Sequence, residues 1–209
     1  MATRSARGII DLRGDWVGLI EAIHAPASDD QAWADGILDC ARKLFPRAAH
    51  TMTYAVAYGS NRELLDIPLA RPAAVLPILE RFRLVVDDEA TSWIPFHFGG
   101  AVLTIREAAR ELDDRLARRI IEGNAREGFG ESMAIVAHPA PGLVVGLSAA
   151  FEDVVEITRP ERELLTRVAR HLEAGYRLRT DESVVVAEVD AKGRVDAPSA
   201  SAARIGAHL

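Results

Sequence analysis

The sequence has one cysteine, few aromatic side chains and no long apolar run, and each scarcity excludes a class of protein. The single thiol, Cys40, excludes an intramolecular disulfide and a cysteine zinc cluster, and it fits a reducing cytoplasm. No window approaches the roughly 20 apolar residues that a membrane-spanning helix needs. The first residues include arginines but lack the apolar core of a signal peptide. We therefore expect a cytoplasmic protein that has no membrane partner.

A surplus of positive charge is also missing. The chain has 25 lysines and arginines against 31 acidic residues, which gives a formal net charge of −6. Nucleic-acid-binding domains usually have a basic balance or a basic face, so this charge disfavours a protein that binds DNA by itself. The apolar fraction of 49% and the charged fraction of 27% are ordinary for a globular domain. A chain of 209 residues is long enough to bury a substantial core.

Apolar spacing divides the chain into helices and antiparallel strands. Helical spacing covers residues 15–25, 28–44, 72–86, 104–120 and 158–179, and strands are predicted over 50–58, 63–70, 131–138 and 142–151. Ser28, Thr104 and Thr158 each precede a glutamine or glutamate by three residues, as in a capping box. The order predicts an α+β fold in which helices flank an antiparallel sheet. We expect a leader over 1–14, one domain over 15–182, and a short hairpin with a linker or tail over 183–209.

Two long segments carry a family resemblance. "GLIEAIHAPASDDQAWADGILDCARKLF" and "GFGESMAIVAHPAPGLVVGLSAAFEDVVEITRPERELLTRVARHLEAGYRLR" resemble the GAF-like sensory domains that precede LuxR-type helix-turn-helix modules. The resemblance implies a GAF/PAS-like sheet and a bacterial sensor that binds a small molecule or a partner. It also implies that DNA is reached only through a helix-turn-helix, which we do not find in this chain. Tyr54, Tyr58 and Asp66 are nearest to the pocket residues of the related acyl-homoserine-lactone receptors, but the surrounding motif is missing.

The segment over 158–179 combines an apolar stripe with six arginines and has three interpretations. It is a core helix, a core helix that also joins two subunits, or a helix that reads DNA. The 3, 4 spacing of the stripe favours a core helix. A regulator that recognises symmetric operators usually works as a pair, so we expect a homodimer with Leu172 and Tyr176 near its seam.

Catalytic and metal-binding patterns are weak. Cys40 lies beside the apolar stripe of its predicted helix, which favours a structural thiol over a nucleophile. The histidines, among them His24 and His171, are scattered and lack the spacing of metal ligands. We expect no enzymatic activity, no metal and no cofactor. Two alternatives stay open, namely an enzyme or metal site on the same fold and a dimerising module without a ligand.

An aromatic cluster lies within the predicted loop over 87–101. Aromatic side chains in a loop need burial, so they either cover the core or form the wall of a cavity. Ligand pockets are mostly apolar with a few placed polar groups. The residues that we expect in such a pocket are Tyr54, Tyr58, Phe82, Trp93, Phe96, His97 and Met133.

Overall fold

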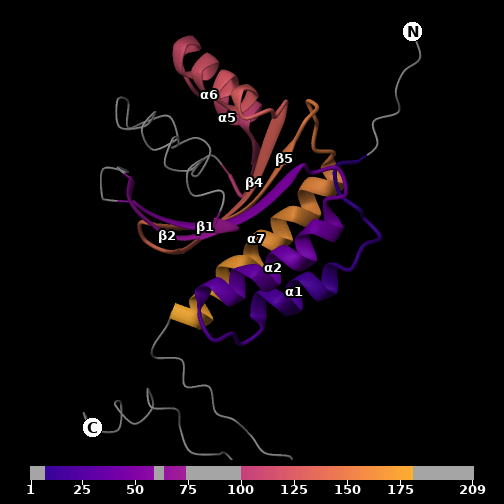
Figure 1. Ribbon diagram of the computed structural model, residues 1–209, viewed down its shortest axis with the longest axis vertical. Helices are drawn as coiled ribbons and strands as arrows, with labels where there is room; N and C mark the ends of the chain where they lie inside the picture. The colour runs from indigo at the N-terminus through magenta and orange to yellow at the C-terminus, as the bar shows by residue number, and fades with distance from the viewer. Residues whose placement is uncertain (1–7, 59–63, 74–99, 181–209) are drawn as a thin grey trace, which may run out of the picture.

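A five-stranded antiparallel sheet forms the centre of the computed structural model, which describes residues 8–58, 64–73 and 100–180 (Figure 1). Its strands are β1 (His50–Tyr58), β2 (Leu64–Arg71), β3 (Val102–Thr104), β4 (Glu131–Ala140) and β5 (Leu143–Phe151). They lie in the order β2-β1-β5-β4-β3, and each neighbouring pair is antiparallel. The sheet and the helices around it confirm the predicted α+β fold.

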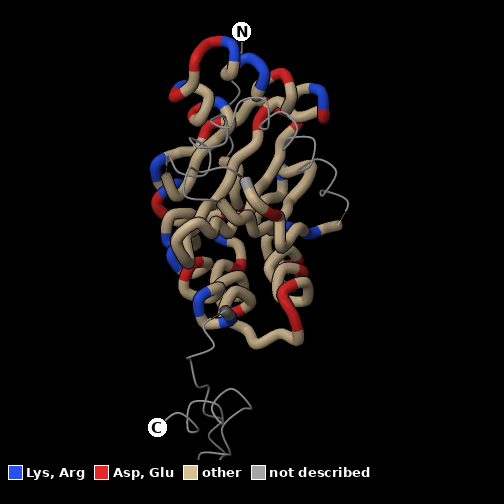
Figure 2. Tube along the Cα trace, turned by 90° about the vertical axis from the view of Figure 1, so that its left-hand side faces the viewer, with Lys and Arg blue, Asp and Glu red and all other residues tan. Residues whose placement is uncertain are grey.

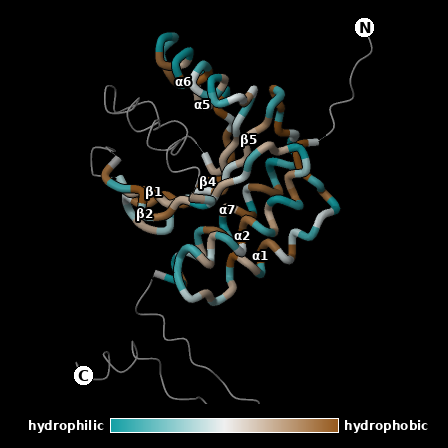
Figure 3. The backbone as a smooth tube through the Cα atoms, viewed as in Figure 1, coloured by the Kyte–Doolittle hydropathy of each residue, from teal (hydrophilic) through white to brown (hydrophobic). Residues whose placement is uncertain are grey.

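The helices form two groups on different sides of the sheet. The first group is α1 (Trp16–His24), α2 (Asp30–Leu44) and α7 (Arg159–Thr180), which pack together against one face (Figure 1). The second group is α5 (Ile105–Ala109) and α6 (Asp114–Arg126), which lie apart from the first (Figure 1). Of the α6 side chains only Leu116 and Asn124 are buried, and most of this helix is hydrophilic in Figure 3. Only the first group therefore builds a large helix–sheet core.

Strand alternation divides the buried side chains between the two faces. On the helix-covered face, Ala55 of β1 and Leu147 of β5 join the core that α1, α2 and α7 complete. On the other face, Tyr54 and Val56 of β1 join a second cluster with Ala108 of α5. The sheet therefore has apolar residues on both faces, and the two clusters are different in composition.

Local capping explains where the helices begin. Asp29 caps α2 and accepts a hydrogen bond from the amide of Ala32, whereas Ser28 donates to Asp29 at 3.2 Å. The predicted start at Ser28 is therefore shifted by one residue, because the carboxylate is the stronger acceptor for helix amides. The predicted capping box of Thr104 and Glu107 is confirmed, with both reciprocal bonds present.

The helix predicted after Thr104 is divided into α5 and α6. The side chain of Asp113 accepts hydrogen bonds from the amides of Arg115 and Leu116 and starts a new helix there. Four residues separate the two helices, so a continuous apolar stripe from Ala108 to Ile120 does not form on one helix.

The core interpretation of the arginine-rich segment is confirmed by α7. Its stripe is buried, and the members of this stripe are Leu165, Val168, Ala169, Leu172 and Tyr176. Four of its six arginines pair with acidic side chains, namely Arg159 with Glu163, Arg162 with Glu107, Arg177 with Glu173 and Arg179 with Asp30. Figure 2 shows basic and acidic segments interspersed along the described helices. The positive charge of α7 is therefore largely compensated within the chain.

Several predicted elements lie outside the described residues. They are most of the helix over 72–86, most of the aromatic loop over 87–101, and the hairpin over 183–197. Among the helices that the structure describes, none is both long and apolar enough to span a membrane.

Candidate functional site

The candidate site is the face of the sheet opposite α1, α2 and α7, which we call the tyrosine face. Its buried members are Tyr54, Val56, Tyr58, Ala134, Val136 and Val144 from the sheet, with Ile105 and Ala108 from α5. Half-buried apolar side chains pack against this cluster, and they are Met52, Ile67, Ile120 and Ile121. The members of this cluster are apolar except for the two tyrosine hydroxyl groups.

Tyr54 occupies the middle of the tyrosine face because a glycine lies opposite it. In the pairing of β1 with β5, Tyr54 is opposite Gly146, and Val136 of β4 is the next residue across. A Cβ atom at position 146 would overlap the ring of Tyr54, including its hydroxyl-bearing end. The ring therefore lies close against the β5 backbone, and any larger side chain at 146 would displace it.

Ser148 places a second hydroxyl beside that ring. It is opposite Met52 of β1 and Ala134 of β4, so it lies on the tyrosine face, and it is only 3% exposed. Its Oγ has no hydrogen bond of standard geometry to any described residue. A hydrogen bond between Ser148 and the Tyr54 phenol, although outside that standard geometry, opposes the rise in the pKa of the phenol. A buried hydroxyl without a full partner is costly, so this position is suited to a hydrogen bond from a bound molecule.

Both tyrosines on this face are neutral at physiological pH. Burial raises the pKa of Tyr54 to about 12. Burial also raises the pKa of Tyr58, and the neighbouring Tyr54 raises it further. The face therefore offers neutral hydroxyl groups on an apolar surface. This chemistry favours binding a small uncharged or weakly polar molecule over acid–base catalysis, which needs a group that titrates near the working pH.

The structure brings together only part of the predicted pocket. Tyr54 and Tyr58 share one face, as predicted. Met133 is fully buried on the opposite face, in the core with α7, because it is opposite Ala149 and therefore has the other strand parity. This separates Met133 from the two tyrosines and corrects its assignment. Four further predicted residues lie outside the described residues, and they are Phe82, Trp93, Phe96 and His97.

The two residues expected at a dimer seam are buried within a single chain. Leu172 has no exposed surface, and Tyr176 is 4% exposed with its ring 5.5 Å from that of Trp33 in an edge-to-face arrangement. Neither side chain has the exposed area that contact with a second subunit requires. The apolar stripe that suggested the seam belongs to the core, so these two residues are corrected to core positions.

Sequence reasoning missed Gly146 and Ser148. Both lie in the strand that was predicted over 142–151, but their importance depends on which β1 residue is opposite each of them. That register arises from pairing across about 90 residues of chain. An alternation pattern gives the two faces of a strand, and it does not give the neighbour across the sheet.

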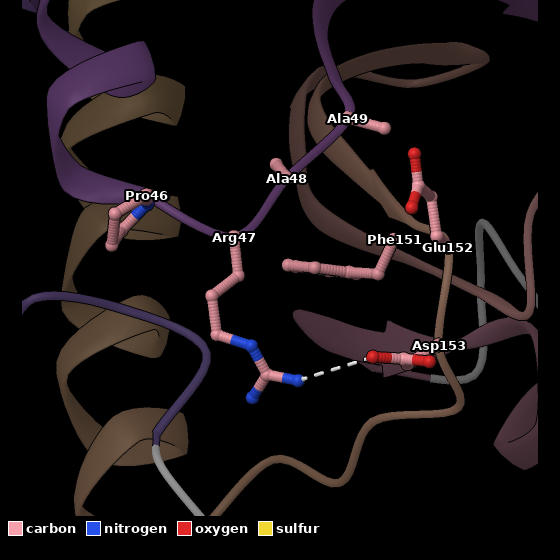
Figure 4. A pocket seen from close by; sticks show the side chains of 7 residues that line it. All are labelled: Pro46, Arg47, Ala48, Ala49, Phe151, Glu152 and Asp153. Atoms are coloured by element: carbon pink, nitrogen blue, oxygen red, sulfur yellow. Dashed lines mark ion pairs between the residues drawn. The ribbon is translucent and has the colours of Figure 1, made fainter.

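A surface hollow lies at the end of β5 (Figure 4). It has a volume of about 340 Å³, and it is lined by Pro46, Arg47, Ala48, Ala49, Phe151, Glu152 and Asp153. Figure 4 shows the guanidinium of Arg47 directed toward Asp153, at an N–O distance of 4.0 Å. Its lining has one arginine and two acidic residues, and the arginine faces Asp153, so the hollow has no strong preference for an anion. It also lacks a nucleophile, and it is the weaker candidate.

Cys40 has the environment of a structural thiol. Its Sγ donates to the carbonyl of Gly18 at 3.6 Å, which joins α2 to α1. Burial raises the pKa of the thiol, so the reactive thiolate is disfavoured at neutral pH. Among the residues that the structure describes, no three His, Cys, Asp or Glu side chains converge as a metal site would require.

Comparisons with known proteins give distant structural likenesses. No family model matches the sequence, and no curated protein matches it. One similar structure is a domain of a two-component sensor histidine kinase protein from Sinorhizobium meliloti, with 11% identity, 75% of this chain and 96% of that chain covered, and a TM-score of 0.45. Another is SdiA from Escherichia coli, with 15% identity and a TM-score of 0.48. The match covers 82% of this chain and 70% of that chain.

A further SdiA structure, in complex with octanoyl-rac-glycerol, matches with 14% identity, 68% of this chain and 58% of that chain covered, and a TM-score of 0.40. These values describe a distant likeness of the backbone. They assign neither a family nor an activity to this chain.

Proposed function

We propose that this chain is a non-enzymatic sensory domain that binds a small, largely apolar molecule on the tyrosine face. The observation that supports this proposal is the Ser148 hydroxyl, which is buried on an apolar face and whose contact with the Tyr54 phenol falls outside standard hydrogen-bond geometry. A ligand with one polar group and an apolar body would satisfy that hydroxyl and pack among the surrounding aliphatic side chains, which are buried and would have to part to admit it. The resemblance of the sequence to sensory domains of LuxR-type regulators agrees with this role.

A path from the tyrosine face to α7 supports a regulatory output. Helix α5 contributes Ile105 and Ala108 to the face, and its capping residue Glu107 pairs with Arg162 of α7 at 2.5 Å. Arg162 also donates to the carbonyl of Val102 in β3. A ligand that shifts α5 would therefore change the contacts at the start of α7. Binding of a ligand on the tyrosine face would in this way change contacts on the other side of the sheet.

The same proposal includes that the chain forms a homodimer and acts in transcription regulation. The arginines of α7 are largely paired within the chain, which disfavours direct DNA reading by that helix. Sedimentation over a range of concentrations should show a dimer. A chain that remains monomeric at high concentration would contradict that part of the proposal, whereas ligand binding would be unaffected.

Native mass spectrometry of the protein purified from its own cells tests the central claim. We expect a small molecule to copurify, and we expect the environment-sensitive dye anilinonaphthalene sulfonate to compete with it. Ser148→Ala removes only the hydroxyl and should weaken binding of the copurified molecule about fivefold, the equivalent of a hydrogen bond of about 1 kcal/mol.

Thr51→Val is the matched control. The Thr51 hydroxyl is also buried and without a described partner, but it lies on the opposite face of the sheet. The Thr51→Val substitution should therefore leave the affinity for the ligand unchanged. Equal effects of the two substitutions, or a chain that binds neither dye nor cellular molecule, would contradict the proposed site and favour a dimerising module without a ligand.

A further inference from the structure

Two histidines that are far apart in the sequence meet on the surface between α1 and α7. The Nε2 atom of His24 lies 3.2 Å from the Nδ1 atom of His171, and 147 positions separate the two residues. Their rings are edge to face, with centroids 5.4 Å apart. His24 is exposed and His171 is half-buried. Solvent and dissolved ions therefore have access to the pair.

The crossing of the two helices fixes this distance. Gly175 lies one turn after His171, and a Cβ atom there would come within 2.5 Å of the carbonyl oxygen of Ile23, the residue before His24. The backbones approach closely because this glycine has no side chain. The indole of Trp33 donates to the same Ile23 carbonyl at 2.8 Å and holds the end of α1 in place. The two imidazoles are therefore brought together by a rigid part of the core.

The spacing of the two nitrogens matches that of two ligands on one transition-metal ion. Imidazole nitrogens lie about 2.0–2.1 Å from zinc, so two of them at a tetrahedral angle are about 3.3 Å apart. At the right angle of a square-planar copper or nickel site they are about 2.9 Å apart. The observed 3.2 Å lies between these values. The second side-chain torsion of histidine is soft, so a modest rotation of each ring would direct both lone pairs at one ion.

The surroundings favour a bound cation at this position. His24 is in the last turn of α1, where the carbonyl end of the helix dipole attracts positive charge.

We propose that His24 and His171 form a two-histidine binding site for a divalent transition-metal ion of the copper, nickel or zinc class. No third His, Cys, Asp or Glu of the described residues joins them, so water molecules complete the coordination. An ion there would clamp the end of α1 to the middle of α7. The site is on the far side of the sheet from the tyrosine face, so the proposed ligand contributes no group to it.

Titration of the tag-free full chain with Cu²⁺, followed by electron paramagnetic resonance and calorimetry, tests the proposal. We expect one ion per chain and a spectrum with two coordinated imidazole nitrogens. Changing a group that only orients a ligand costs about 10- to 100-fold in metal affinity, so His24→Ala and His171→Ala should each cost at least about tenfold.

Two further variants separate metal binding from a structural hydrogen bond and from adventitious binding. His171→Asn keeps a polar nitrogen or oxygen close to the Nδ1 position, so it should preserve stability and still lose the ion. His138→Ala removes an exposed histidine on β4 and should leave the ion bound. Retention of the two-nitrogen spectrum in His24→Ala and His171→Ala, or its loss in His138→Ala alone, would overturn the proposal. A wild-type chain that binds no Cu²⁺ would also overturn it.

Discussion

Gly146 shows how one missing side chain determines the tyrosine face. The ring of Tyr54 occupies the space that a Cβ atom at 146 would need. We predict that Gly146→Ala lowers the free energy of unfolding by about 1–3 kcal/mol, because the buried ring must leave its position. Chemical denaturation measures the loss. A variant as stable as the wild type would show that the ring is not held there.

Gly36 provides the control for that substitution. It is exposed within α2, and a Cβ atom there would contact nothing within 4 Å. Gly36→Ala should therefore raise stability by up to about 1 kcal/mol, since alanine is the better helix former. Opposite signs for the two glycine substitutions are the expected result.

Predictability from sequence differs among the residues of the site. Alternation in β1 was enough to place Tyr54 and Tyr58 on one face. The same reasoning did not place Met133, because the parity of β4 relative to β1 depends on pairing through β5. His24 and His171 are brought together only by the crossing of α1 and α7, which no local pattern encodes.

Among the elements, α7 depends on a single buried carboxylate at its start. Glu161 is 1% exposed, and it accepts hydrogen bonds from the amides of Ile9, Ile10 and Thr158 and from the Thr158 hydroxyl. We predict that Glu161→Gln costs about 2–3 kcal/mol, because the amide group of glutamine would face donors that need an acceptor. Thermal and chemical denaturation would measure the change.

Glu163 is the matched control on the same turn. It is exposed and pairs with Arg159 at 2.8 Å in an i,i+4 arrangement. Glu163→Gln should change stability by less than about 0.5 kcal/mol. Similar losses at the two positions would contradict the role assigned to Glu161.

The contact between α2 and β2 should make stability depend on pH. Arg71 donates to both carboxylate oxygens of Asp35, at 2.8 and 2.5 Å, and this hydrogen bonding holds the pKa of Asp35 below its ordinary value. The folded state therefore binds the proton less readily than the unfolded state. This contribution is present above the unfolded value of about 3.9 and is lost as pH falls through the folded pKa.

Asp35→Asn tests that dependence. The variant should be less stable than the wild type at neutral pH, and the difference should shrink as the pH falls below about 4. Urea denaturation at a series of pH values would show it. A constant difference across the series would mean that the carboxylate charge is not responsible.

Elements were predicted better than their ends. The alternating stretches over 50–58 and 142–151 became β1 and β5 almost without change, because strand alternation is a local property. The start of α2 and the division between α5 and α6 were missed, since Asp29 and Asp113 compete with nearby residues for the same helix amides. Caps are decided by that competition, which spacing alone does not resolve.

At the scale of the whole molecule, the pKa values of all the tyrosines reflect their burial. The sequence has three, and burial raises the pKa of Tyr54 to about 12 and raises those of Tyr58 and Tyr176. Near pH 10.5 the folded protein should therefore show less tyrosinate absorbance in the near ultraviolet than the unfolded chain, whose pKa values of about 10 leave its tyrosines mostly ionised.

The same shift has a consequence for stability. The folded state holds the phenolic protons more tightly, so stability should fall as the pH rises above about 10. Early tyrosinate absorbance in a protein that is still folded would show that at least one phenol is open to solvent.

The order of the strands also affects how the chain folds during its synthesis on the ribosome. β1 lies between β2, which follows it closely, and β5, which follows it after most of the domain. During synthesis, β1 has no partner on that side until residue 151 has left the ribosome, and α7 covers the sheet later still. The nascent chain therefore carries an apolar strand edge for much of its translation. We therefore expect a pause in translation before β5 emerges to lower the yield of folded protein, and a holding chaperone present at that stage to restore it.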